Sequence, residues 1–186
     1  FAFVQAKASD NPHLPSSYSE ALASLPEKMR RAYQDGDWDI FEGQYFTEFR
    51  RDVHVIKPFE IPPSWRRFRS LDYGLDCTAC YWWAVAPNGQ EYIYRELYRS
   101  NLTLSKAARH ILDMTPEHEC IEYTVASPDL WNRRQDTGYS GAEILSKSGL
   151  GNLVRADNRR IPGWRALRER LLPYEDEHGV LTAQLR

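Results

Sequence analysis

Two aspartates, Asp72 and Asp129, stand where predicted β-strands end, and carboxylates in such positions can hold a divalent metal ion. Asp72 lies near the end of the alternating run 67–73, and Asp129 follows the β-rich run 120–126 through a Ser-Pro turn. Mg²⁺ and Mn²⁺ prefer oxygen ligands, and two such ions about 4 Å apart can assist cleavage of a phosphodiester bond. Taken singly, each aspartate is explained as well by an ordinary turn or cap.

The elements that must position these residues follow from hydrophobic periodicity and turn signals. We predict strands over 67–73, 78–85, 91–98, 120–126, 152–156 and 180–185, and helices over 103–114, 140–148 and 163–172. The second and third of these strands meet at Asn88-Gly89, which favours a type I′ turn. Upstream, the signals predict helices over 16–25 and 26–36 and a short strand over 53–56.

This order of elements is typical of the ribonuclease H-like fold. Three strands form an antiparallel meander, and helical crossovers then return the fourth strand to lie parallel beside the first. We therefore predict an α/β protein with a mixed five-stranded sheet flanked by helices. In that arrangement Asp72 and Asp129 reach the same edge of the sheet.

Composition excludes several classes of protein. Apolar residues make up 42% and charged residues 27% of the 186 residues, which indicates a folded domain and not a disordered or fibrous chain. No uncharged run approaches the roughly 20 residues of a membrane-spanning helix. Three cysteines give no even disulfide framework and suit a reducing compartment, and the Cys77/Cys80 pair has no partner pair for zinc. The sequence has no Walker A motif and no serine nucleophile elbow.

Positive charge is concentrated in one part of the chain although the net charge is −2. Residues 132–170 contain eight arginines and one lysine against four acids. Because guanidinium groups grip phosphates with two hydrogen bonds, this stretch favours nucleic acid as a partner. The alternative is a solvated helix face with internal ion pairs.

Several motifs together resemble a known family. The segments 10–28, 36–38 and 41–46 resemble the end of the ATPase domain of tailed-phage large terminase subunits. The segments 70–74, 94–98, 131–138 and 156–164 resemble the nuclease domain that follows it, in the same order. The resemblance implies that residues 1–65 are the end of the ATPase domain and a linker. It implies that residues 66–186 are a ribonuclease H-like nuclease domain without its C-terminal part.

By this resemblance, the chain belongs to a metal-dependent endonuclease that cuts concatemeric double-stranded DNA at the start and end of packaging. The cofactor would be Mg²⁺ or Mn²⁺ in a two-metal site, and the location would be the host cytoplasm. The implied partners are DNA, the portal protein, the terminase small subunit and the ATPase domain of the same chain, with no membrane. An alternative is a DNA-binding or portal-docking module without catalysis. A resolvase or transposase of the same fold is a third reading, which leaves residues 1–50 unexplained.

The resemblance assigns Asp72 as the catalytic aspartate of the first strand. The second family acid directly follows an Ala at the end of the fourth strand, where this sequence has Ser127. In extended backbone Asp129 would face the same side about 6–7 Å further along, so we predict that it replaces the missing acid. The third family acid lies beyond Arg186, and Glu96 is a possible substitute ligand or else an ion-paired strand residue. For contacts with DNA phosphates we predict Arg133, Arg134, Arg159 and Arg160, with plain surface charge as the alternative.

Overall fold

The computed structural model describes residues 8–23, 30, 34, 45–133, 135 and 138–186. The chain divides into two compact units, Phe1–Thr47 and Glu48–Arg186. In the first unit a short 3₁₀ helix, η1 (Ala8–Asp10), precedes helix α1 (Ser16–Ala23), which confirms the helix predicted over 16–25 as far as residue 23. The helix predicted over 26–36 falls almost entirely outside the described residues. The second unit begins at residue 48, upstream of the boundary predicted at residue 65.

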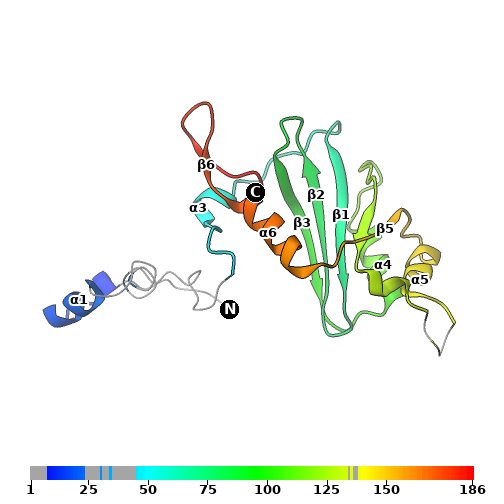
Figure 1. Ribbon diagram of the computed structural model, residues 1–186, viewed down its shortest axis with the longest axis horizontal. Coiled ribbons are helices and arrows are strands. Elements are labelled where there is room, and N and C mark those ends of the chain that lie inside the picture. Colours follow the sequence, from blue (N-terminus) through cyan, green and yellow to red (C-terminus); the bar gives the residue numbers. More distant parts are fainter. Residues whose placement is uncertain (1–7, 24–29, 31–33, 35–44, 134, 136–137) are drawn as a thin grey trace. The chain divides into compact units, whose positions relative to one another are not determined.

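The second unit is built on a five-stranded mixed sheet with the order β3-β2-β1-β4-β5 (Figure 1). The antiparallel meander consists of β1 (Arg66–Tyr73), β2 (Thr78–Val85) and β3 (Glu91–Arg99). Strand β4 (Thr124–Ala126) lies parallel to β1, and β5 (Leu153–Arg155) lies parallel to β4. The predicted ribonuclease H-like topology is therefore confirmed.

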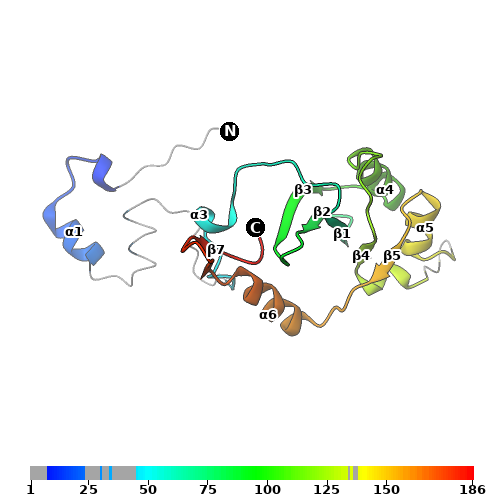
Figure 2. The same ribbon diagram turned by 90° about the horizontal axis from the view of Figure 1, so that it is seen from above.

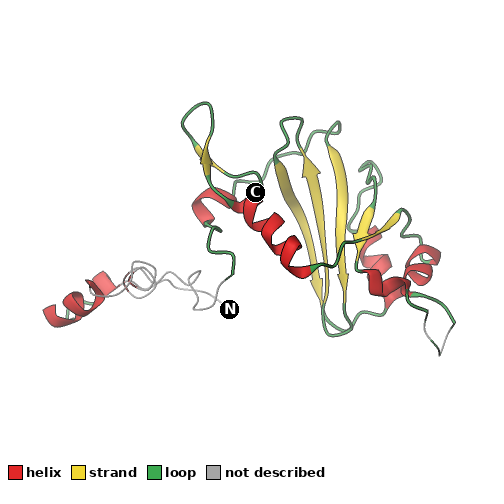
Figure 3. Cartoon of the chain, viewed as in Figure 1, coloured by secondary structure: helices red, strands yellow, loops and turns green. Residues whose placement is uncertain are grey.

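Helices lie on both sides of the sheet, but only those on one side pack into its core (Figure 2). Helices α4 (Leu104–Asp113) and α5 (Gly141–Lys147) lie on one side, and α6 (Arg160–Leu171) lies on the other (Figures 2 and 3). A 3₁₀ helix, η2 (Pro128–Trp131), directly follows β4. Across the described part of the chain, no helix combines the length and the apolar character that crossing a bilayer requires.

The main core lies between the sheet and helices α4 and α5. Its centre contains Trp82 from β2, Ile111 from α4 and Leu145 from α5, none of which has any exposed surface. Alternation along β2 places Cys80 and Trp82 on this inner face. Burying side chains of this size stabilises the fold by about 1.5–3 kcal/mol each, so this core fixes the helices against the sheet.

Three local predictions are wrong for identifiable reasons. The first two residues of the segment predicted as a strand over 53–56 belong to the short helix α3 (Arg51–His54), because His54 Nε2 hydrogen-bonds the distant Leu171 carbonyl at 3.0 Å. The β2–β3 hairpin is not type I′. Among its residues only Gly89 has a positive φ, so the turn is the three-residue kind that places glycine in the left-handed region.

The C-terminal strand is also shorter than predicted and lies outside the main sheet. Strand β7 (Leu181–Thr182) pairs only with β6 (Tyr174–Glu175) in a separate hairpin. The last residues then run beside the start of β3. Glu91 N donates to the Gln184 carbonyl at 2.7 Å, and Ile93 N donates to the Arg186 carbonyl at 2.8 Å.

Candidate metal and nucleic-acid site

The pairing of β1 with β4 sets the position of Asp72. Leu71 is opposite Ala126 in the parallel ladder, and both side chains are buried on the α4/α5 side. Because side chains alternate along a strand, Asp72 and Ser127 project from the other face, on strands about 4.8 Å apart. Asp72 is exposed, and its neighbour is the position where the family resemblance places a second acid.

The backbone around Asp129 differs from the one predicted. The prediction assumed extended backbone after Ser127, but Pro128–Trp131 form the 3₁₀ helix η2. A 3₁₀ helix rises about 2.0 Å per residue, compared with about 3.3 Å in a strand, so the alternation argument does not apply here. Asp129 is exposed within η2, whereas its neighbour Leu130 is buried in the core.

The two aspartates provide a donor set that suits Mg²⁺. Within the described part of the chain, neither carboxylate makes a hydrogen bond or an ion pair, so the oxygens of both remain free to bind a ligand. Mg²⁺ commonly binds through one or two carboxylates and completes its shell with water and substrate phosphate. Among the described residues there is no cluster of three or more ligating His, Cys, Asp or Glu side chains. The candidate ligands are therefore two exposed acids, Asp72 near the end of β1 and Asp129 in η2 after β4.

Glu96 does not lie beside these acids. It pairs with Tyr81 on β2, and Tyr81 in turn pairs with Ser70 on β1, so two strand spacings, or about 10 Å, separate Glu96 from β1. The Tyr81 hydroxyl donates a hydrogen bond to Glu96 at 3.3 Å. This placement agrees with a polar strand residue better than with a ligand that shares an ion with Asp72.

A further acid, Asp157, lies at the same edge and was not predicted as a site residue. It follows β5, and Ala156 N donates to the Ala126 carbonyl at 2.8 Å, which holds this chain segment against the end of β4. Arg159 binds both carboxylate oxygens of Asp157, with Nε at 3.0 Å and Nη2 at 2.6 Å. These hydrogen bonds lower the pKa of Asp157 to about 2. A signal was present in the sequence, because Asp157 directly follows the predicted strand 152–156.

The predicted phosphate-binding arginines differ in their contacts. The Arg133 side chain is exposed and makes no hydrogen bond or ion pair with the described residues. Arg134 lies outside the described residues. Arg159 is occupied by Asp157, whereas the Arg160 guanidinium lies 5.7 Å from the centre of the Trp164 ring.

Two further cations, one at the end of β5 and one at the end of α5, lie against aromatic rings. The Arg155 guanidinium is 5.2 Å from the centre of the Trp131 ring, and Lys147 Nζ is 3.6 Å from the centre of the Tyr139 ring. Contact with a ring holds a cation in place while its N–H donors stay available to another partner. The sequence analysis did not single out these two residues.

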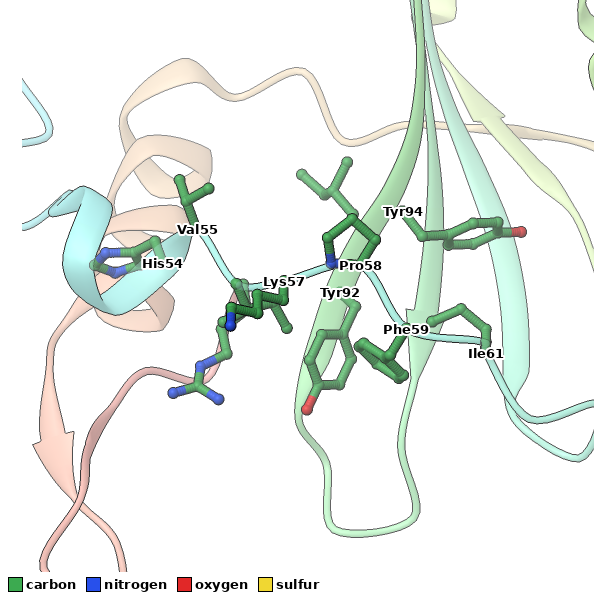
Figure 4. Close-up of a pocket in the computed structure, with 11 residues that line it drawn as sticks. His54, Val55, Lys57, Pro58, Phe59, Ile61, Tyr92 and Tyr94 are labelled. Carbon is green, nitrogen blue, oxygen red and sulfur yellow. The ribbon is translucent and has the colours of Figure 1, made fainter.

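A pocket of about 290 Å³ lies elsewhere in the second unit (Figure 4). The segment 54–61, residues 92–94 of β3 and Arg186 line it. Tyr92 and Phe59 meet there edge to face, with ring centroids 5.2 Å apart. Tyr92 pairs with Ala84, and Ala84 pairs with Arg67 near the start of β1, so the pocket lies away from Asp72.

Solved structures that match this chain include large terminases of bacteriophages. The P22 large terminase nuclease domain matches with a TM-score of 0.57 and 16% sequence identity, over 75% of this chain and 83% of that one. The chain has the terminase nuclease fold. The large terminase of a thermophilic bacteriophage, solved in complex with ATP-gamma-S, matches with a TM-score of 0.56 and 20% identity. The terminase resemblance inferred from the motifs is thus confirmed at the level of the fold.

The extent of these matches differs. The match with the ATP-gamma-S-bound large terminase covers 89% of this chain but only 41% of that protein, so this chain spans less than half of it. A large terminase nuclease from the thermophilic phage G20c with bound magnesium matches at a TM-score of 0.41, too low to inform the site here. No protein-family model matches the sequence, and no curated protein does.

Proposed function

We propose that this chain is part of a tailed-phage large terminase subunit and contains its metal-dependent endonuclease. The observation that supports the proposal is the parallel pairing of β1, which carries Asp72 near its end, with β4, which is followed by Asp129 in η2, within a terminase nuclease fold. The substrate is concatemeric double-stranded DNA, cut at the start and end of packaging in the host cytoplasm.

The proposed chemistry assigns one role to the acidic side chains and another to the basic ones. Asp72 and Asp129 would hold Mg²⁺ or Mn²⁺. When bound, such an ion polarises a phosphodiester and lowers the pKa of a water molecule that attacks it. Arg133 and Arg160 bind the phosphates on either side of the cut and so orient the backbone against the two acids.

The proposal also assigns partners. The match with the ATP-gamma-S-bound large terminase covers a larger share of this chain than the match with the P22 nuclease domain, which supports residues 1–65 as the end of an ATPase domain and a linker. That ATPase domain, the portal protein and the terminase small subunit are then the other parts of the packaging motor.

Cleavage of a supercoiled plasmid with Mn²⁺ or Mg²⁺ tests the nuclease. We expect the unsubstituted chain to nick and linearise the plasmid, and Asp72→Asn to stop cleavage without changing the thermal unfolding curve. Asp113→Asn is the matched control, because Asp113 is an exposed acid at the end of α4. Undiminished cleavage by purified Asp72→Asn would contradict the role of this residue.

A second pair of variants tests Asp129. Asp129→Asn should lose activity, and adding Ser127→Asp should restore it, because this places a carboxylate beside Asp72 at the register position already described. If Asp129→Asn is fully active, the second ligand lies elsewhere.

One observation favours a second candidate, a module that holds DNA without cutting it. A serine occupies position 127, and the described residues offer no three-ligand cluster. Such a module binds DNA with a steep salt dependence and shows no metal-dependent cleavage in the same preparation. Cleavage that requires Asp72 excludes it.

A further inference from the structure

Helix α5 approaches η2 closely at one glycine. Gly141 is the first residue of α5, and a Cβ placed on it would lie 2.7 Å from Leu130 Cδ2 and 3.3 Å from the Leu130 carbonyl oxygen. A separation of 2.7 Å is too short for two carbon atoms, so any side chain larger than hydrogen would displace Leu130. Leu130 Cδ2 is the end of a flexible side chain and can turn away from a new Cβ, whereas the second contact is with the backbone of η2, which would have to move by a few tenths of an ångström.

Leu130 links this contact to the candidate site. It is 9% exposed, packs in the main core, and is adjacent in η2 to the exposed Asp129. Leu130 is the buried residue of this four-residue helix, and Trp131 beside it also packs against the core, so the fit of these two side chains sets the position of η2. A displacement of Leu130 therefore moves the Asp129 carboxylate.

The amino-terminal end of α5 cannot easily move to relieve the contact. Ser140 caps the helix by accepting a hydrogen bond from Glu143 N at 3.2 Å, and Glu143 accepts one from Ser140 N at 2.7 Å. Leu145, one turn further on, is completely buried in the core. The strain of an added methyl group would therefore fall on η2.

We propose that Gly141 is a positioning residue that sets the Asp129 carboxylate in place through Leu130. This inference rests on the proposed function, because it takes Asp129 to be a metal ligand. Because residue 141 has no side chain, η2 can pack closely against α5. In this packed position η2 directs the Asp129 carboxylate to the end of β1, beside Asp72.

Metal binding provides the main test, with Tb³⁺ luminescence or Mn²⁺ titration on the whole chain as the readout. Residues that orient a metal ligand typically change metal affinity by about 10–100-fold. We expect Gly141→Ala to raise the concentration for half-saturation by at least about tenfold. Cleavage should be lost at limiting Mn²⁺ and recovered at saturating Mn²⁺, a split that a general loss of folding does not produce.

A matched control and a rescue variant distinguish an effect on the position of η2 from an effect on the stability of the fold. Gly163→Ala makes the same change inside helix α6, where an added Cβ meets no atom within 4 Å, and should leave the half-saturation concentration unchanged. Leu130→Val removes the atom that the new methyl group meets. Combined with Gly141→Ala, it should restore most of the metal affinity.

A metal-free measurement distinguishes failure of this inference from failure of the proposed function. With 5-fluorotryptophan incorporated, the ¹⁹F signal of Trp131 in η2 should shift in Gly141→Ala and return in the double variant. An unshifted signal together with unchanged metal affinity overturns the positioning role. A shifted signal in a chain that binds no Tb³⁺ even without substitution overturns the metal role of Asp129 itself.

If Gly141→Ala does not fold, Leu130→Ala tests the same contact from the other side. Loss of the Leu130 side chain, which holds η2 in the core, should also weaken Tb³⁺ binding by about tenfold. Leu130→Ala protein that folds and binds Tb³⁺ with unchanged affinity overturns the inference.

Discussion

The salt dependence of DNA binding should distinguish arginines that are available to DNA from the one that is already occupied. Arg159 donates hydrogen bonds to both carboxylate oxygens of Asp157, whereas Arg160 lies against Trp164 and has no ion pair among the described residues. Replacing Arg160 removes an available cation. Replacing Asp157 with asparagine releases Arg159 without removing any cation. The two substitutions should therefore change the salt slope in opposite directions.

The size of each change follows from counterion release. Each phosphate contact with duplex DNA contributes roughly 0.9 to the slope of log K against log salt concentration. Between 50 and 200 mM salt, one contact therefore changes affinity by about 3.5-fold. We expect Arg160→Ala to reduce the slope by about 0.9 and Asp157→Asn to increase it by about 0.9.

The assay is fluorescence anisotropy of a short labelled duplex at several salt concentrations, with EDTA present to prevent cleavage. Arg66→Ala is the control, because Arg66 is paired with Glu122 at 2.8 Å at the start of β1 and should not change the slope. A slope that falls in both site variants, or that stays unchanged in Asp157→Asn, would refute the reasoning from the ion pair.

Three further predictions concern the stability and the burial of side chains in the domain that carries the site. Burial alone would raise the pKa of Glu119, but hydrogen bonds from Arg95 and Tyr94 outweigh it and lower the pKa below 4.5. Its stabilisation is therefore present above about pH 4.5 and lost as the pH falls through the lowered pKa, so Glu119→Gln should cost about 2 kcal/mol in urea unfolding at pH 7 and progressively less as the pH falls below 4.5. Burial raises the pKa of Cys80 to about 12, so a thiol reagent at pH 8 should modify the exposed Cys120 and leave Cys80 unreacted until unfolding; equal rates would contradict the burial. Leu145→Ala should lower the free energy of unfolding by about 2–5 kcal/mol because the side chain is fully buried, whereas the exposed Leu112→Ala should cost under about 1 kcal/mol.

The sheet was predictable because each of its strands has a local signal. The bounds of β2 coincide with the predicted run 78–85. Along this run inner and outer residues alternate, and turn residues stand at both of its ends. The short strand predicted over 53–56 failed because the contact that decides its structure joins His54 to Leu171, 117 residues away. No local pattern reports such a contact.

The pairing of β1 with β4 was predictable, whereas the role of the two acids stays a prediction. The topology predicts Asp72 and Asp129 at one edge, because parallel neighbours end on the same side. It did not show that η2 is helical, since Pro128 fits a turn or a 3₁₀ start equally well. Nor did it show that Arg159 would fold back on Asp157, because two residues of opposite charge at that spacing can equally well point apart.

The ladder between β1 and β4 has only three residue pairs, from Arg69 with Thr124 to Leu71 with Ala126. Short ladders open more readily than long ones, and here the opening would begin one residue from Asp72. Amide hydrogen exchange at residues 124–126 should therefore be faster than in the centre of β2. A duplex or an ion bound across the strand ends would slow that exchange. The exchange rate of these three amides would therefore show whether the site is occupied.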